Sequence, residues 1–86
     1  MMPKITIYTT NYCGYCFRAK ALLNRKGAPF EEIDVSDPAL RRVMMERANG
    51  GRTVPQIFIG ERHVGGSDEL HELDRRGQLD PLHQAA

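Results

Sequence analysis

Residues 4–26 read KITIYTTNYCGYCFRAKALLNRK, and within this stretch the hydrophobic period changes from that of a strand to that of a helix. Over residues 4–9, isoleucines alternate with polar or aromatic residues, which is typical of a β-strand. Over residues 14–26, apolar side chains recur at intervals of three and four, which is typical of a helix with one buried face. Gly27 then provides a C-terminal stop. The stretch therefore predicts a strand that leads directly into a helix.

Further along the chain, the same patterns predict a strand, a helix, a hairpin and a last helix. We expect these elements at residues 30–35, 38–48, 56–59 with 62–64, and 67–77. Asp37 is suited to cap the second helix, and Ser67-Asp68-Glu69 is a capped, acidic start for the last one. Leu79 and Leu82 could dock one more turn. Within the second helix, one stripe at helical spacing comprises Leu40, Val43, Met44, Arg47 and Ala48.

The order of these elements indicates an α/β fold. A strand, a helix and a second strand in succession make the two strands parallel, with a right-handed crossover, and give a small sheet covered by helices. The chain has 86 residues, 41% of them apolar, which is enough for one domain over residues 1–86 and too few for two. No internal repeat or linker divides it.

The charge balance and the apolar runs argue against several classes of function. Twelve Lys and Arg residues against eleven Asp and Glu residues leave a net charge of +1, so the basic surface that nucleic-acid binding requires is not expected. The longest apolar runs are three residues, whereas a membrane helix needs about 20. The N-terminus lacks the apolar segment of a secretory signal. We therefore expect a cytoplasmic protein with neither nucleic acid nor membrane as a partner.

The only two cysteines, Cys13 and Cys16, lie at the start of the helix predicted after the first strand. In a reducing compartment such a pair is typically catalytic or metal-binding rather than a stabilising cross-link. Free N–H groups and the macrodipole at a helix N-terminus favour a Cys13 thiolate, so Cys13 is the predicted nucleophile. Cys16 lies one turn deeper on the apolar face and is the predicted resolving cysteine. Helix positions three apart lie about 5 to 6 Å from each other, which is within disulfide range.

Two other uses of the cysteine pair are disfavoured by the rest of the sequence. A zinc site normally takes four ligands, and this chain offers one cysteine pair with His63, His71 and His83, which lack ligand spacing and are expected at the surface. A structural disulfide would close a very short loop in a cytoplasmic protein. Redox catalysis is the interpretation that remains, and it requires no metal.

Three motifs in the chain resemble those of glutaredoxins, in the same order and over nearly the whole length. They are Cys13-Gly14-Tyr15-Cys16 after the first strand, Thr53-Val54-Pro55 before the hairpin, and Gly65-Gly66-Ser67-Asp68 before the last helix. The resemblance implies a thioredoxin-like fold, with a four-stranded mixed sheet flanked by three helices. It also implies a glutathione-dependent oxidoreductase that reduces protein disulfides and glutathione mixed disulfides. Such a protein serves electron transport and cell redox homeostasis, as a monomer unless a cluster bridges two copies.

The same resemblance implies a glutathione site. In the family, the proline matching Pro55 is cis and lies opposite the redox cysteines, and the backbone at Val54 pairs with the cysteinyl part of glutathione as an added strand. The helix N-terminus at Gly66-Ser67-Asp68 would hold the γ-glutamyl end. The glutathione-binding residues expected in this way are Tyr15, Arg42, Thr53, Val54, Pro55, Gln56, Gly66, Ser67 and Asp68.

Two positions depart from the usual pattern of the family. Gly14 replaces a proline between the cysteines, and in the family the loss of this proline is associated with a [2Fe–2S] cluster held between two subunits. Cys13 would then be a cluster ligand, together with glutathione. Thr10 stands where the family usually has a lysine that pairs with the glycine carboxylate of glutathione. We therefore expect either weaker glutathione binding or a compensating role of Arg42 and Gln56 at that end.

Three other functional classes remain as alternatives to a glutathione-dependent enzyme. The first is a thioredoxin-like carrier reduced by a flavin reductase, against which the Gly-Gly-Ser-Asp segment argues. The second is a cluster-carrying assembly protein with little turnover. The third is a binding module in which the cysteine pair is incidental, and it is the least favoured of the three.

Overall fold

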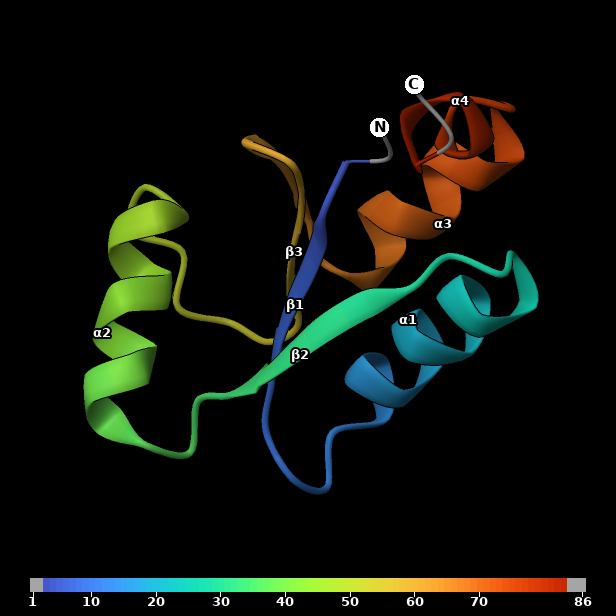
Figure 1. Ribbon diagram of the computed structural model, residues 1–86. Helices are drawn as coiled ribbons and strands as arrows, with labels where there is room; N and C mark the ends of the chain where they lie inside the picture. The colour runs from blue at the N-terminus through green and yellow to red at the C-terminus, as the bar shows by residue number, and fades with distance from the viewer. Residues whose placement is uncertain (1–2, 84–86) are drawn as a thin grey trace.

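The computed structural model describes residues 3–83 of the chain, which form four strands and four helices (Figure 1). The elements, in chain order, are β1 (Ile5–Thr9), α1 (Gly14–Arg25), β2 (Phe30–Asp34), α2 (Pro38–Arg47), β3 (Gln56–Ile59), β4 (Arg62–Gly65), α3 (Ser67–Arg75) and α4 (Leu79–His83). The predicted order of elements is confirmed, with boundaries that differ by one or two residues. The expected number of three helices is wrong by one, because the tail forms the short helix α4. No helix in the described part of the chain is long and apolar enough to cross a membrane.

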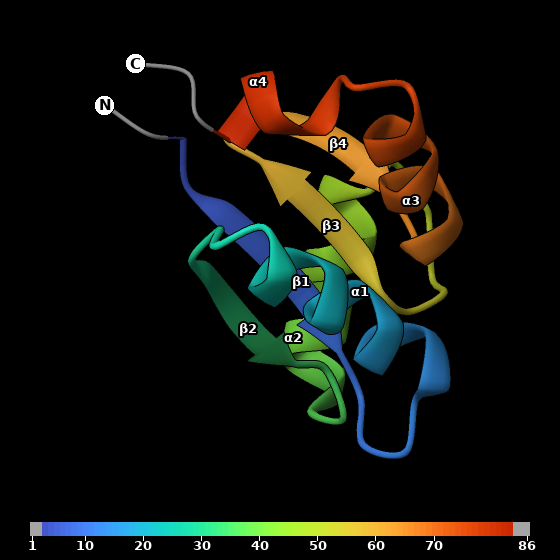
Figure 2. The same cartoon turned by 90° about the vertical axis from the view of Figure 1, so that its right-hand side faces the viewer.

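The four strands form one mixed sheet in the order β2-β1-β3-β4. Strand β1 is parallel to β2 and antiparallel to β3, and β3 is antiparallel to β4, as Figure 2 shows. Tyr8 near the end of β1 is therefore paired with Gln56 at the start of β3. This register brings the loop after β1, which carries Cys13, beside Pro55, which immediately precedes β3.

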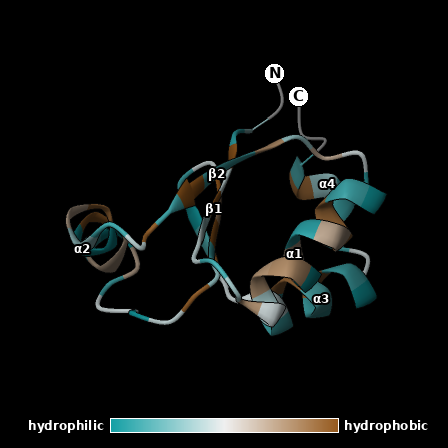
Figure 3. Ribbon diagram, turned by 90° about the horizontal axis from the view of Figure 1, so that it is seen from below, coloured by the Kyte–Doolittle hydropathy of each residue, from teal (hydrophilic) through white to brown (hydrophobic). Residues whose placement is uncertain are grey.

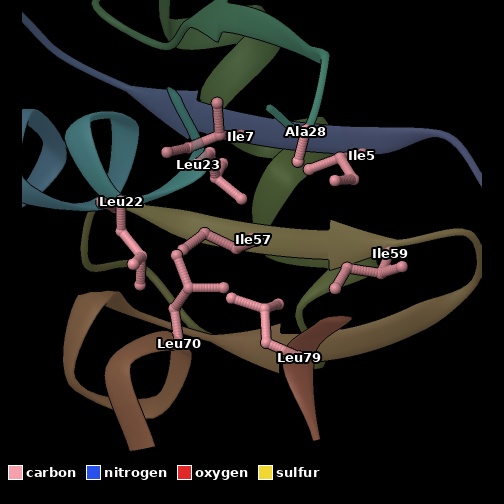
Figure 4. Packing of buried hydrophobic residues seen from close by; sticks show 10 residues of the cluster. Ile5, Ile7, Leu22, Leu23, Ala28, Ile57, Ile59, Leu70 and Leu79 are labelled. Atoms are coloured by element: carbon pink, nitrogen blue, oxygen red, sulfur yellow. The ribbon is translucent and has the colours of Figure 1, made fainter. Parts of the chain in front are cut away.

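The sheet separates two groups of buried side chains. Helices α1 and α3 lie on one side of it and α2 lies on the other (Figures 1 and 3). On the α1 and α3 side, isoleucines from the sheet pack against leucines from the helices, as Figure 4 shows. These are Ile5, Ile7, Ile57, Ile59, Leu22, Leu23, Leu70 and Leu79. On the α2 side, the buried cluster is smaller and comprises Tyr8, Val35, Met44, Ala48 and Phe58.

Helix α2 begins as predicted but does not bury the whole predicted stripe. The side chain of Asp37 accepts a hydrogen bond from the Ala39 N–H at 2.9 Å, which caps the helix. Of the stripe, Met44 and Ala48 are buried, whereas Leu40 and Val43 are 41% and 49% exposed. Helix α2 is turned so that Met44 and Ala48, one turn apart, face the sheet.

Arg47, a member of the same stripe, covers part of the sheet with a charged group instead of an apolar one. Its guanidinium carbon lies 4.0 Å from the centroid of the Phe58 ring, and its Nη1 donates a hydrogen bond to the Tyr8 hydroxyl at 3.0 Å. The planar cation stacks on the aromatic face. A residue that the sequence pattern places in an apolar stripe therefore packs on the sheet through its guanidinium.

Helix α4 buries a histidine that was expected at the surface, so that expectation is wrong for His83. Leu79 and His83, four residues apart and so on one face of the helix, are 0% and 2% exposed. Lys26, at the end of α1, pairs with Asp74 of α3 at 2.6 Å and with Asp80 of α4 at 3.5 Å. The hydrogen bond to Asp74 is the main cause of the raised pKa of Lys26. This lysine links the three helices at their ends.

Candidate redox site

The cysteine pair lies at the N-terminus of α1, as the sequence predicts. Cys13 is the N-cap residue, with an extended backbone, and its sulfur accepts a hydrogen bond from the Cys16 N–H at 3.1 Å. The two residues are joined by a disulfide, and their Cα atoms are 5.2 Å apart. The geometry therefore allows the pair to be oxidised with both residues in their places on the helix.

The two sulfurs lie in different environments. Cys16 is 2% exposed, packed within the helix face that meets the sheet, whereas Cys13 is half-buried at the helix end. The first turn of α1 contains no acidic residue. Once the disulfide is reduced, a thiolate at Cys13 meets the positive end of the helix and an N–H donor without a nearby carboxylate on that turn. An accessible, anion-stabilised sulfur beside a sheltered one is an arrangement that supports thiol-disulfide exchange.

Aromatic side chains are exposed around Cys13. Tyr12 has a φ of +57° and is fully exposed, Tyr15 is 58% exposed, and Phe17 is 71% exposed. Tyr15 was a predicted site residue, whereas the sequence patterns did not single out Tyr12 and Phe17. A positive φ is uncommon for a residue that carries a side chain, and it turns the loop just before the cysteine. The surface next to the reactive sulfur is thus apolar and open.

The segment before β3 lies directly opposite the cysteine pair. The Val54–Pro55 peptide bond is cis, as the resemblance implies, and Pro55 is buried. The carbonyl oxygen of Val54 lies 3.9 Å from the sulfur of Cys13, although the two residues are 41 positions apart. Because this approach depends on the pairing of β1 with β3, a sequence pattern alone does not establish it.

A groove of about 280 Å³ runs from this point to the start of α3. All the residues expected to bind glutathione line it except Arg42 and Gln56, and Glu69 lines it as well. The lining residues are Tyr15, Thr53, Val54, Pro55, Gly66, Ser67, Asp68 and Glu69. Three separate motifs of the sequence therefore meet in one concave surface next to Cys13.

The N-terminus of α3 forms one end of the groove. Gly66 is the N-cap, so the cap lies one residue before the serine that the sequence indicated. The Glu69 carboxylate accepts a hydrogen bond from the Gly66 N–H at 2.7 Å. The first hydrogen bond within the helix runs from the Leu70 N–H to the Gly66 carbonyl, so the Ser67 and Asp68 N–H groups precede the helical ladder. These two amides, together with that of Glu69, which also precedes the Leu70 N–H, are the ones that this helix end offers to an anion.

The two predicted residues that lie outside the groove have other surroundings. Arg42 is exposed on α2. Gln56 is buried on the opposite face of the sheet, where its Nε2 donates to the Thr53 carbonyl at 3.0 Å and its Oε1 lies 2.6 Å from His63 Nε2. Arg41 rather than Arg42 supports the neighbouring loop, because it donates to the Arg52 carbonyl at 2.7 Å. No pattern in the sequence indicated the roles of Arg41 and His63.

Thr10 lies in a different hollow, of about 390 Å³, which is lined by both cysteines, Lys20 and Glu32 among other residues. Glu32 accepts hydrogen bonds from the Thr9 hydroxyl at 2.7 Å and from Lys20 Nζ at 2.9 Å. These two bonds, that of Thr9 first, lower the pKa of Glu32. The hollow thus contains a fixed carboxylate and an ammonium that already neutralise each other.

Residues 3–83 contain no group of three or more His, Cys, Asp or Glu side chains that could hold a metal ion. A metal site made by a single copy of the described chain therefore has no set of ligands to use.

Both the sequence and the fold of this chain are similar to those of known proteins. The glutaredoxin family model matches residues 5–64. The chain is 54% identical to a glutaredoxin of Pseudomonas aeruginosa, over 94% of this chain and 96% of the relative. It is 51% identical to glutaredoxin 3 of Escherichia coli K12, over 94% of this chain and 98% of the relative.

Solved structures give the same result. The solution structure of a Brucella melitensis glutaredoxin aligns with a TM-score of 0.83 and 57% identity, over 95% of this chain and 89% of the other. The crystal structure of a buckwheat glutaredoxin–glutathione complex aligns with a TM-score of 0.86 and 34% identity, over 95% of this chain and 77% of the other. These neighbours share the thioredoxin-like fold, which confirms the predicted fold class.

Proposed function

The chain belongs to the glutaredoxin family and has the role of a thiol-disulfide oxidoreductase, and from this premise we propose that its reductant is glutathione. The observation that carries the proposal is the groove beside Cys13, which joins the cis-proline segment to the N-terminus of α3. Such a groove offers backbone for the middle of an extended tripeptide and helix amides for a carboxylate at one end. The structural neighbour from buckwheat is a glutaredoxin–glutathione complex, which supports the same assignment.

In this proposal, Val54 and the start of α3 divide the recognition of glutathione between them. The backbone of Val54 pairs with the cysteinyl residue, close to Cys13, since the Val54 carbonyl is 3.9 Å from the Cys13 sulfur. The Ser67 and Asp68 N–H groups donate hydrogen bonds to the α-carboxylate of the γ-glutamyl residue, and the Asp68 carboxylate meets its ammonium group. Tyr15 and Thr53 complete the wall of the groove.

Cys13 acts as the nucleophile in the reduction of a glutathione mixed disulfide. Its thiolate attacks the glutathione sulfur, a Cys13–glutathione disulfide forms, and the bond to the substrate sulfur breaks. The released substrate thiolate takes a proton from water. The thiolate of a second glutathione then attacks the bound glutathione sulfur, which releases glutathione disulfide and restores the Cys13 thiolate. This route uses two glutathione equivalents, counting the one on the substrate, and does not need Cys16.

Reduction of a protein disulfide uses both cysteines. Cys13 attacks one sulfur of the substrate, and the resulting mixed disulfide is broken when the Cys16 thiolate attacks the Cys13 sulfur. The products are the dithiol substrate and the Cys13–Cys16 disulfide, and two glutathiones reduce that disulfide. The Cα separation of 5.2 Å allows this disulfide to close within the helix. The substrates in this proposal are disulfide-bearing or glutathionylated proteins of the cytoplasm, and the enzyme is a monomer.

The experiment is glutathione-coupled reduction of a small mixed disulfide, followed through glutathione reductase and NADPH, for the native protein and for Cys13→Ser and Cys16→Ser. We expect turnover that is abolished by Cys13→Ser and retained by Cys16→Ser. Reduction of a protein disulfide should be lost in both variants. No turnover of the native protein with glutathione, together with reduction by thioredoxin reductase alone, would identify a thioredoxin-like carrier instead.

A [2Fe–2S] cluster is a second candidate, which one observation favours. Gly14 leaves open space beside the cysteines, because a Cβ atom at this position would meet no heavy atom within 4 Å apart from those of its chain neighbours and the adjacent helix backbone. The described part of one chain lacks a full ligand set, so a cluster would lie between two copies, with Cys13 and a glutathione thiol from each side. Reconstitution with iron, sulfide and glutathione under anaerobic conditions should give visible absorption and a dimer. A colourless monomer after this treatment would reject the cluster.

A further inference from the structure

We propose that His63 is a positioning residue for glutathione, which acts through Gln56 on the peptide group that joins Thr53 to Val54. This inference rests on the proposed glutathione site and adds a residue on the opposite face of the sheet. Three close contacts connect these residues. His63 Nε2 lies 2.6 Å from Gln56 Oε1, and Gln56 Nε2 lies 3.0 Å from the Thr53 carbonyl and 3.2 Å from the Thr53 hydroxyl.

The direction of each hydrogen bond in this chain follows from the Thr53 carbonyl, which can only accept. Gln56 must therefore turn its NH₂ group to Thr53 and its oxygen to His63. An amide in the opposite orientation would place two acceptors against each other. The oxygen of Gln56 needs a donor in turn, so Nε2 of His63 carries a proton. Both the neutral Nε2–H form and the imidazolium of His63 meet this requirement.

The peptide group held in this way is the one that the glutathione site uses. The Thr53 carbonyl and the Val54 N–H belong to the same planar peptide, and in a trans peptide they point in opposite directions. The Thr53–Val54 bond is trans, since in the described chain only Val54–Pro55 is cis. A hydrogen bond from Gln56 to the Thr53 carbonyl therefore also sets the direction of the Val54 N–H, which points away from Gln56. An added strand of glutathione would pair with the Val54 backbone on that side.

Gln56 is held by burial, whereas His63, which is exposed, is held by stacking on an aromatic ring. Gln56 is 5% exposed, so its amide oxygen is sheltered from water. The His63 ring stacks on Phe58, its partner across β3 and β4, with ring centroids 4.8 Å apart and planes inclined by 20°. Arg47 in turn lies on the Phe58 ring, with its guanidinium carbon 4.0 Å from the centroid. The ring of His63 is thus oriented by stacking, while its Nε2 determines the rotamer of Gln56.

Loss of the His63 donor would leave the Gln56 oxygen sheltered and unpaired. A sheltered acceptor without a donor is unfavourable, and rotation of the amide towards another donor would relieve it. That rotation takes the NH₂ group away from Thr53 and frees the peptide that carries the Val54 N–H. The consequence is weaker binding of glutathione without a change in the attacking sulfur.

The test compares His63→Phe, which keeps an aromatic ring on Phe58 without the donor, with His63→Gln, which keeps an N–H donor of similar reach. We expect His63→Phe to raise KM for a small glutathione mixed disulfide about three- to tenfold, with kcat within about twofold. His63→Gln should restore KM to within about twofold of the native value. Arg62→Ala, a change of the neighbouring exposed residue of β4 outside this chain of contacts, is the control.

A second variant, Gln56→Met, and a second measurement that does not depend on activity test the same inference. Gln56→Met removes the donor to Thr53 at nearly constant volume and should raise KM to the same extent as His63→Phe, with no further rise in the double variant. In amide NMR spectra of the free proteins, His63→Phe and Gln56→Met should shift the Val54 resonance, and His63→Gln and Arg62→Ala should not.

The outcomes separate the two proposals. A native protein without glutathione turnover would refute the proposed function, while the Val54 shift would still decide the positioning role. The role of His63 would be refuted if turnover were normal and His63→Phe matched Arg62→Ala in KM. It would also be refuted if His63→Gln were as impaired as His63→Phe, since stacking rather than the donor would then be responsible.

Discussion

Replacement of Gly65 by alanine should destabilise the protein through two separate effects at the start of α3. Gly65 has a φ of +116°, a conformation that residues with a Cβ atom rarely adopt. An alanine Cβ at this position would also lie 2.9 Å from Glu69 Oε1 and 3.1 Å from Glu69 Cγ. The Glu69 carboxylate accepts from the Gly66 N–H at 2.7 Å, so the new methyl group displaces the side chain that caps α3.

The two effects can be given approximate magnitudes. A non-glycine residue in a sparsely populated backbone region costs about 1 to 3 kcal/mol, and the loss of a capping hydrogen bond costs about 1 kcal/mol. The free energy of unfolding should therefore fall by about 2 to 4 kcal/mol, which for a domain of this size lowers Tm by about 10 to 25 °C. Because α3 lines the groove, KM for a glutathione mixed disulfide should rise as well.

The assay is urea unfolding of the oxidised protein, so that all variants carry the same disulfide. Gly77→Ala is the matched control, because Gly77 has a φ of +68° and its Cβ would meet nothing within 4 Å. That control should lose only about 1 kcal/mol. In the double variant with Glu69→Ala, the decrease in the free energy of unfolding should be smaller than the sum of the two single decreases by about 1 kcal/mol. The reason is that both single changes remove the same capping hydrogen bond. Equal losses for Gly65→Ala and Gly77→Ala would refute the reasoning.

Two further predictions concern charges near the cysteine pair. Glu32 has a lowered pKa in the folded protein, so its stabilising effect is present above its unfolded pKa of about 4.3 and is lost as pH falls through the lower folded value. Glu32→Gln should lower the free energy of unfolding in urea at neutral pH, and it should make the further decrease on acidification smaller. An equal effect of Glu31→Gln, on the same strand, would contradict this prediction. Thr10→Lys should lower KM for glutathione, because an added ammonium group beside Cys13 attracts a carboxylate. The decrease in KM should be smaller at high salt, which screens this attraction. An unchanged KM at low salt would mean that the missing charge is already compensated.

The sequence by itself determined the order of the elements and the place of the reactive sulfur. Alternation over residues 4–9 and helical spacing after residue 14 are local properties, since each records which face of a single element is apolar. The cap at Asp37 and the position of Cys13 at the helix N-terminus are local too, because a cap needs only the next few residues. The family motifs predicted in addition that Pro55 is cis and opposite the cysteines.

The tertiary structure decided which side chains of α2 and α4 are buried, because no local pattern contains this information. A helical stripe does not say which of its residues meets the sheet, so Leu40 and Val43 remained exposed while Arg47 packed on Phe58. Burial of His83 depended on the docking of α4, which the sequence left open.

The groove and its support also needed the tertiary structure. The antiparallel register of β1 with β3 brings Val54 to within 3.9 Å of a sulfur 41 residues away, and the pairing of β3 with β4 brings His63 to Gln56. Contacts between strands depend on register, and register is set by the packing of the whole sheet, because a slip of one residue would turn every side chain to the other face.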